Sequence, residues 1–102
     1  MQYHLYLNRG DRIRYPYLLD IQSDIIDILN TRLVIPLYDS KLVQKPLPER
    51  LNPIIYIDTH AFILMTHQMA SVPLSVLGKK VIYIENEREK IKQAIDLLID
   101  GF

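Results

Sequence analysis

The sequence contains no cysteine, which excludes disulfide bonds, thiolate metal sites and cysteine nucleophiles. It has only three glycines, Gly10, Gly78 and Gly101, and they do not form a glycine-rich loop that could cradle a phosphate group. The longest apolar runs are far shorter than the roughly 20 residues of a transmembrane helix. The first residues do not combine a basic start with an apolar run, so we expect no targeting segment, no membrane partner and a cytoplasmic location.

There is no excess of either charge, since twelve basic and twelve acidic side chains give a formal net charge of zero. Proteins that bind bulk nucleic acid usually carry a basic excess, so the composition disfavours that class. The chain has 102 residues, of which 49% are hydrophobic and 24% charged, as in ordinary globular proteins. We therefore expect residues 1–102 to form a single domain with its own core.

The first two thirds of the chain has the alternation and the β-branched runs of strands. Two hairpins are predicted, the first around a polar turn at residues 9–12 and the second around residues 58–60. Pro36 lacks a backbone N–H, so its strand is expected to lie at an edge, to be bulged or to be split there. The predicted strands cover residues 2–8, 17–22, 31–38, 54–58 and 61–66.

The remaining segments predict a loop, a turn and one helix. Residues 39–52 are rich in proline and charge and are expected to form a surface loop, and residues 78–80 to form a turn. Apolar residues then recur at three- and four-residue steps, which predicts an amphipathic helix over residues 87–100 with Asn86 as its N-cap. Several short strands followed by one helix indicate an α+β domain with a small barrel-like sheet.

The search for catalytic residues yields no complete constellation, and we expect no metal and no cofactor. His60 and His67 flank one predicted strand and lie too far apart to share a metal ion without a sharp bend, and His4 is remote in sequence. Asp24 and Asp27 could form a carboxylate pair, but aspartates are also common in turns, where they bond to their own backbone.

The C-terminal helix ends with charges of the wrong sign for its dipole. Asp96 and Asp100 lie four residues apart on one face, where the dipole favours cations, and the apolar Phe102 follows at an end that should fray. Such local conflicts often mark functional sites. The alternative is that Phe102 folds into the core and the two aspartates are merely solvated.

Three ordered motifs resemble the CcdB toxin family, and the resemblance extends over essentially the whole chain. The opening residues 1–3 and the closing residues 100–102 also fit the family. The motifs are Gln22 to Asp27, Arg32 to Leu37, and Met65-Thr66 followed by Met69 to Gly78.

This resemblance implies an SH3-like β-barrel of antiparallel strands with a C-terminal α-helix, in a homodimer without enzymatic activity. Toxins of this family belong to type II toxin–antitoxin modules and bind the A subunit of DNA gyrase, trapping the enzyme on cleaved DNA. A CcdA-type antitoxin neutralises the toxin with a disordered segment. The pair represses its own operon, so operator DNA is expected as a partner only through the antitoxin complex.

The resemblance also assigns residues to two surfaces. The family's C-terminal Trp-Gly-Ile is here Asp100-Gly101-Phe102, so an ion pair between Asp100 and a gyrase arginine would replace the stacking of a tryptophan. Ile25 and Ile26 could instead be ordinary core or dimer residues, and Tyr3 a core residue. The expected gyrase-binding residues are Asp96, Asp100, Gly101, Phe102, Ile25, Ile26, Gln2 and Tyr3, and the expected antitoxin-binding residues are Tyr6, Asn8, Arg9 and Arg14.

Two other functions fit the same barrel. A MazF-like endoribonuclease toxin would need a basic groove with an acid or base for chemistry at the 2′-hydroxyl group, and the neutral charge counts against it. A degenerate toxin that retains antitoxin binding alone is the second alternative, because Asp100 replaces the family tryptophan.

Overall fold

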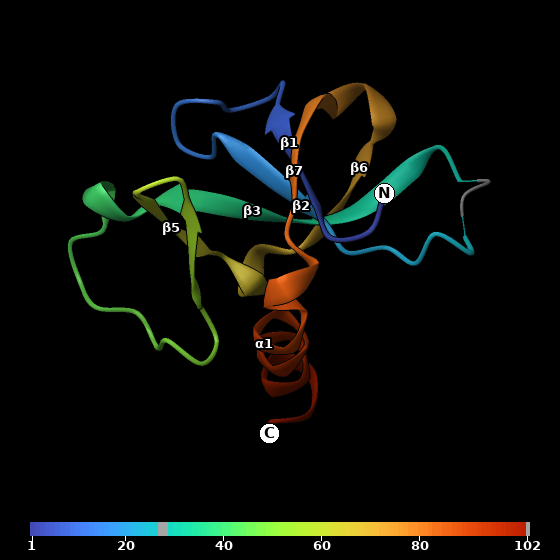
Figure 1. Cartoon of the computed structure of the whole chain (residues 1–102). Coiled ribbons are helices and arrows are strands. Elements are labelled where there is room, and N and C mark those ends of the chain that lie inside the picture. Colours follow the sequence, from blue (N-terminus) through green and yellow to red (C-terminus); the bar gives the residue numbers. More distant parts are fainter. Residues whose placement is uncertain (27–28, 102) are drawn as a thin grey trace.

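The computed structural model describes residues 1–26 and 29–101, which form a curled antiparallel sheet with a helix at the C-terminal end (Figure 1). This arrangement confirms the predicted α+β fold with a small barrel-like sheet and a C-terminal helix. Within the described residues, short 3-10 turns lie at Ser40–Leu42, Thr66–Gln68, Leu74–Val76 and Glu85–Glu87. The elements are β1 (His4–Asn8), β2 (Tyr17–Asp20), β3 (Thr31–Asp39), β4 (Ile54–Ile57), β5 (His60–Leu64), β6 (Ala70–Pro73), β7 (Leu77–Tyr83) and α1 (Arg88–Asp100).

Strand β3 is the centre of the sheet, whose order is β4-β5-β3-β2-β1-β7 with β6 also paired to β3. One side of β3 pairs with β2, and the other side is divided between β6 at residues 31–34 and β5 at residues 37–39. Pro36 lies at this division, and its carbonyl accepts a hydrogen bond from the Met65 N–H. The prediction of an edge strand is wrong, whereas the predicted split is observed, because a residue without an N–H fits where two partner strands meet.

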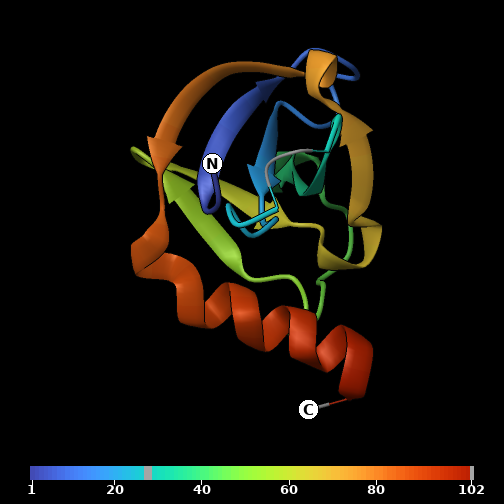
Figure 2. The same ribbon diagram turned by 90° about the vertical axis from the view of Figure 1, so that its right-hand side faces the viewer.

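The core lies inside the curl and is closed by the helix. Its members are buried aliphatic and aromatic side chains from both hairpins and from β3, and Ile91 of α1 packs among them. Figure 2 shows the helix crossing below the curled sheet, with its C-terminal end farthest from the strands. The apolar stripe therefore buries Ile91 and Ala94 but leaves Leu98 and Ile99 exposed.

The strand boundaries differ from the predicted ones where local geometry intervenes. Strand β1 begins at His4, because Tyr3 has a φ of 61° and cannot extend it. Register shifts on either side of Tyr6 also break the predicted alternation, so that Asn8 is buried and Leu7 is only half-buried. Both predicted hairpins are confirmed, and the predicted loop at 39–52 contains the turn Ser40–Leu42.

The turn predicted at residues 78–80 is wrong, since these residues lie inside β7 and pair with β1. An edge strand exposed on both faces shows no alternation, which explains why its glycine and two lysines resemble a turn. Gly78 is required there because a Cβ atom would lie 2.8 Å from the carbonyl oxygen of Leu7. The absent side chain lets the two strands approach each other.

The predicted N-cap is also wrong. Asn86 lies within the 3-10 turn Glu85–Glu87, and α1 begins at Arg88 after Glu87, which makes no side-chain capping bond. The turn forms because the Ile84 N–H is already held by the Tyr3 carbonyl, at 2.8 Å, and Ile84 is buried. Because Ile84 is held in this way, the chain turns at residues 85–87. Asn86 therefore lies inside the turn and not at the start of the helix.

Replacing Gly78 by alanine tests the pairing of β7 with β1. The added methyl group would press on a backbone oxygen that has little freedom to move, so Gly78→Ala should lower the free energy of unfolding by about 1–3 kcal/mol. The neighbouring exposed variant Lys79→Ala should change it by less than about 0.5 kcal/mol. Urea denaturation of both variants measures this, and equal stabilities would contradict the assigned pairing.

Candidate partner-binding site

A buried ion pair joins β2 to β3. The Asp20 side chain is 0% exposed and the Arg32 side chain 9%, and the Arg32 Nε donates to Asp20 Oδ2 at 2.9 Å. Asp20 Oδ1 accepts a second bond from the Gln22 N–H at 3.0 Å. Burial alone would lower the pKa of Arg32, but the hydrogen bond and the negative charge of Asp20 raise it. The guanidinium therefore remains charged and well placed to organise neighbouring polar groups.

The pair braces the β2–β3 loop, defined here as residues 21–26. Arg32 Nη2 donates to the Gln22 carbonyl at 3.0 Å and to Asp24 Oδ1 at 3.3 Å. The Gln22 side chain spans the loop, because its amide donates to the Ile26 carbonyl at 2.6 Å and its oxygen accepts from the Leu33 N–H at 3.1 Å. A Ser23 turn completes the loop. These bonds give the loop a defined conformation.

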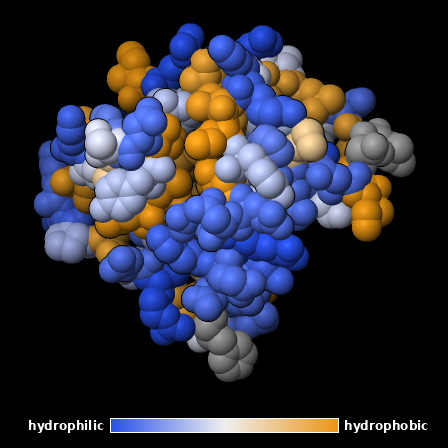
Figure 3. Space-filling model, in the orientation of Figure 1, coloured by the Kyte–Doolittle hydropathy of each residue, from blue (hydrophilic) through white to orange (hydrophobic). Residues whose placement is uncertain are grey.

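The braced loop presents two isoleucines to solvent. Ile25 is 93% exposed and Ile26 is partly exposed, and Figure 3 shows hydrophobic surface at the right-hand end of the molecule, where this loop lies. If a partner buried such a side chain on binding, the binding free energy would improve by about 1.5–3 kcal/mol. An exposed isoleucine on a loop held by a rigid scaffold is typical of a binding residue, and it is not a core residue here.

Gln2 joins this loop, whereas Tyr3 belongs to the core. The Gln2 N–H donates to Asp24 Oδ1 at 3.1 Å, and its side chain donates to the Ile21 carbonyl. The bond from the Gln2 N–H is the main cause of a lowered pKa at Asp24, to which Arg32 also contributes. Tyr3 is buried, and the Arg88 guanidinium lies 5.7 Å from its ring centroid. The structure therefore brings Gln2, Ile25 and Ile26 together.

The other predicted gyrase-binding residues lie at the far end of α1. Asp96 and Asp100 are exposed, and Gly101 closes the helix with a φ of 79° and an N–H bond to the Leu97 carbonyl. Phe102 lies outside the described residues. Tyr3 adjoins Arg88 at the start of the helix, and twelve residues of helical rise separate Arg88 from Asp100 by about 18 Å. One chain thus presents two separate groups of predicted residues.

The predicted antitoxin residues surround the β1–β2 hairpin. Arg9 and Arg14 are exposed, and Tyr6 is half-buried, with a pKa raised first by burial and then by the charge of Asp20. Asn8 is buried, and its side chain donates to the Tyr15 carbonyl at 2.8 Å and accepts from the Gly10 N–H at 2.8 Å. Asn8 therefore shapes the hairpin loop from inside.

The candidate catalytic residues occupy separate places. Asp24 is bound to Arg32, and Asp27 lies outside the described residues. His4 stacks on Tyr83 with ring centroids 4.5 Å apart. His60 Nε2 lies 3.0 Å from Asp39 Oδ1, and His67 adjoins Asn52. In residues 1–26 and 29–101, no three histidine, aspartate or glutamate side chains are grouped to hold a metal ion.

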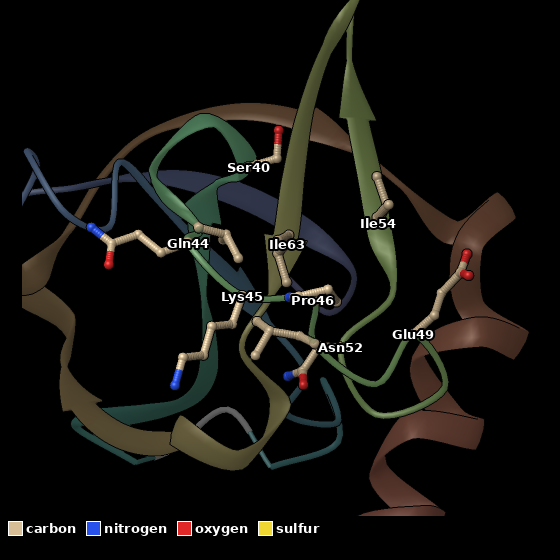
Figure 4. Close-up of a pocket in the computed structure, with 10 residues that line it drawn as sticks. Ser40, Gln44, Lys45, Pro46, Glu49, Asn52, Ile54 and Ile63 are labelled. Atoms are coloured by element: carbon tan, nitrogen blue, oxygen red, sulfur yellow. The ribbon is translucent and has the colours of Figure 1, made fainter.

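A hollow of about 460 Å³ lies between the residue 40–52 loop and strands β4 and β5 (Figure 4). Asn52 is the buried polar side chain in its lining, and its amide donates to the Leu64 carbonyl at 3.1 Å. The same amide lies 3.2 Å from the His67 ring. Asn52 therefore ties the loop to β5, which is a structural role.

Sequence reasoning missed Asp20, Gln22 and Arg32 as the supports of the site. The available signal was one acidic and one basic residue, each inside a predicted strand that otherwise carries apolar residues. A charge in such a strand is costly unless it is paired. Nothing local identifies its partner, because the pair spans two strands.

The charge pair can be tested by comparing two aspartates that bind the same guanidinium. Asp20→Asn leaves the buried Arg32 charge without its main partner and should lower the free energy of unfolding by about 3–5 kcal/mol. Asp24→Asn removes an exposed partner and should cost at most about 1 kcal/mol. Chemical denaturation at pH 7 measures both, and a loss for Asp20→Asn no larger than that for Asp24→Asn would show that the buried pair is not what holds this region.

The part of the chain that the structure describes contains no helix long and apolar enough to cross a membrane.

A comparison with protein-family models matches the family described as CcdB protein over residues 2–101, nearly the full length. That match agrees with the curled sheet, the C-terminal helix and the order of the three sequence motifs. The chain belongs to the CcdB family, and its membership supports a toxin of a toxin–antitoxin module.

Proposed function

We propose that this protein is a type II toxin that binds the DNA gyrase A subunit and traps the gyrase–DNA cleavage complex. A CcdA-type antitoxin neutralises it, and the pair binds operator DNA. Family membership supports this proposal, and the observation that carries it is Ile25, held almost fully exposed by a loop that the Asp20–Arg32 pair braces. Binding in this way requires no catalytic group on the toxin.

The gyrase surface is proposed to form across a homodimer. Within one chain, the β2–β3 loop and the end of α1 are separate, so a second copy is needed to bring the two groups onto one surface. Leu98 and Ile99 supply exposed apolar area near the helix end, where a dimer contact would cover it. The acidic end, with Asp96 and Asp100, then faces a cationic part of gyrase.

Ile25 can be compared with Ile13, an isoleucine of equal exposure elsewhere. Ile25 is 93% exposed and Ile13 is 91% exposed, on the β1–β2 hairpin. Ile25→Ser should weaken binding to a purified gyrase A fragment roughly 10-fold or more, since one buried aliphatic side chain is worth about 1.5–3 kcal/mol. Ile13→Ser should leave the Kd unchanged. Calorimetric titration measures both, and equal effects would remove Ile25 from the gyrase surface.

The acidic helix end gives an independent test. If Asp100 pairs with a gyrase arginine away from water, Asp100→Asn should weaken binding roughly 30-fold or more, because losing one partner of a buried pair costs about 2–5 kcal/mol. Removing residues 101–102 should abolish toxicity. The shortened chain should still sediment as a dimer and should still bind antitoxin. Unchanged gyrase binding by both variants would contradict a role for this end.

Plating cells that express the gene, with normal gyrase or with gyrase resistant to this family, tests the proposed function as a whole. Killing only with normal gyrase is expected. Killing with both would favour the endoribonuclease alternative, and purified protein that cleaves RNA would establish it. Survival with both, together with intact antitoxin binding, would identify a degenerate toxin.

A further inference from the structure

Two aromatic rings lie against each other where the first strand pairs with the last. His4 of β1 and Tyr83 of β7 are directly opposite each other in the two strands. Their ring centroids are 4.5 Å apart and the rings are 23° from parallel, so they are stacked. Tyr83 is nevertheless 50% exposed. Because the His4 ring covers one face of Tyr83, the exposed area of Tyr83 lies on its other face and its edges. We call this pair the His4–Tyr83 stack.

The stack is held from both sides. His4 Nδ1 lies 3.3 Å from the Gln2 carbonyl oxygen. Burial raises the pKa of Tyr83, and hydrogen bonding to Glu85 raises it further. Glu85 in turn lies beside the start of α1, where its Oε1 is 3.9 Å from Arg88 Nη1. A ring that is held before binding loses little conformational entropy when a partner covers it.

The stack is continuous with the β2–β3 loop. Gln2, whose carbonyl lies beside His4, also donates its N–H to Asp24 Oδ1 at 3.1 Å. Besides burial, the negative charge of Asp24 contributes to the raised pKa of Tyr83. Figure 2 shows the N-terminal segment between β7 and this loop. One surface therefore runs from Tyr83 through Gln2 to the loop that carries Ile25.

We propose that the His4–Tyr83 stack is part of the surface that binds the DNA gyrase A subunit, with Tyr83 as a contact and His4 as the residue that positions its ring. This inference rests on the proposed gyrase function and adds two residues to it. Tyrosine is enriched among the residues that dominate binding at protein interfaces, because it buries a large area at a low entropic cost. The contact is apolar and uses the ring face, since the hydroxyl group already has Glu85 as its partner.

Tyr83 can be compared with Tyr56, an exposed tyrosine at the opposite edge of the sheet. Tyr83 on β7 is 50% exposed, and Tyr56 on β4 is 64% exposed. Tyr83→Ala should weaken binding to a purified gyrase A fragment roughly 10-fold or more, because a tyrosine that can bury about 150–250 Å² loses the half left for gyrase. Tyr83→Phe, which keeps the ring, should bind like the wild type. Tyr56→Ala should leave the Kd unchanged.

The positioning role of His4 is tested by a double-mutant cycle. His4→Ala should weaken gyrase binding roughly 2- to 10-fold, the amount expected for the loss of one aromatic pair, and His4→Phe should restore it. In a chain that already carries Tyr83→Ala, the change His4→Ala should have no further effect on the Kd, because His4 acts through Tyr83. An additive effect would contradict the positioning role.

Calorimetric titration measures each Kd at low and high salt, and the loss caused by Tyr83→Ala should be the same at both because the contact is apolar. Thermal melts establish that each variant is folded. If alanine lowers the melting temperature, Tyr83→Thr replaces it, since threonine suits a strand, and the same loss of binding is expected.

Gyrase binding that is indifferent to Tyr83→Ala, or weakened equally by Tyr56→Ala, would overturn the proposal. So would a monomeric Tyr83→Ala variant, which would assign the ring to a contact between copies, or a variant that loses antitoxin binding alone. If Ile25→Ser weakens gyrase binding and Tyr83→Ala does not, only this proposal fails. If the folded wild-type chain does not bind gyrase at all, the proposed function fails and this proposal fails with it.

Discussion

The buried Asp20–Arg32 pair holds the β2–β3 loop in its conformation. Taking two charges out of water costs several kcal/mol per ion, and that cost is offset only where further hydrogen bonds satisfy both groups. Here Gln22 and Asp24 supply those bonds, and both residues lie in the loop that carries Ile25. The chemistry that makes the pair tolerable in the core is therefore the same chemistry that shapes the exposed surface.

The parts of the fold that depend on local pattern could be predicted from the sequence. The alternation of apolar and polar residues predicted both hairpins. The recurrence of apolar residues at three- and four-residue steps predicted α1. Strand β7 could not be found this way, because Lys79 and Lys80 lie on an edge strand whose pairing with β1 is decided by contacts about 75 residues away. Pro36 indicated a break in its strand, but the sequence could not show that β5 and β6 meet there, because that depends on pairing with distant residues.

The roles of the candidate site residues also depend on features that the sequence alone does not show. Ile25 and Ile26 were identified from a family resemblance, and their exposure distinguishes a surface role from a core one. Tyr3 shows the reverse, since its φ of 61° and buried ring make it a support of the fold. A residue in that strained region persists only where its surroundings hold it, and here the Asp20 carbonyl and the Ile84 N–H do so.

The net charge of zero describes the surface of this molecule poorly. The zero total conceals two ends, a basic one around Arg9 and Lys80 and an acidic one at Asp96 and Asp100. The longest dimension is 38 Å, several times the screening length of about 8 Å at physiological salt. Charges separated by more than a screening length interact only weakly through solvent, so each end keeps its own local potential. A chain with no net charge can in this way present an acidic surface at one end and a basic surface at the other, each with its own local potential.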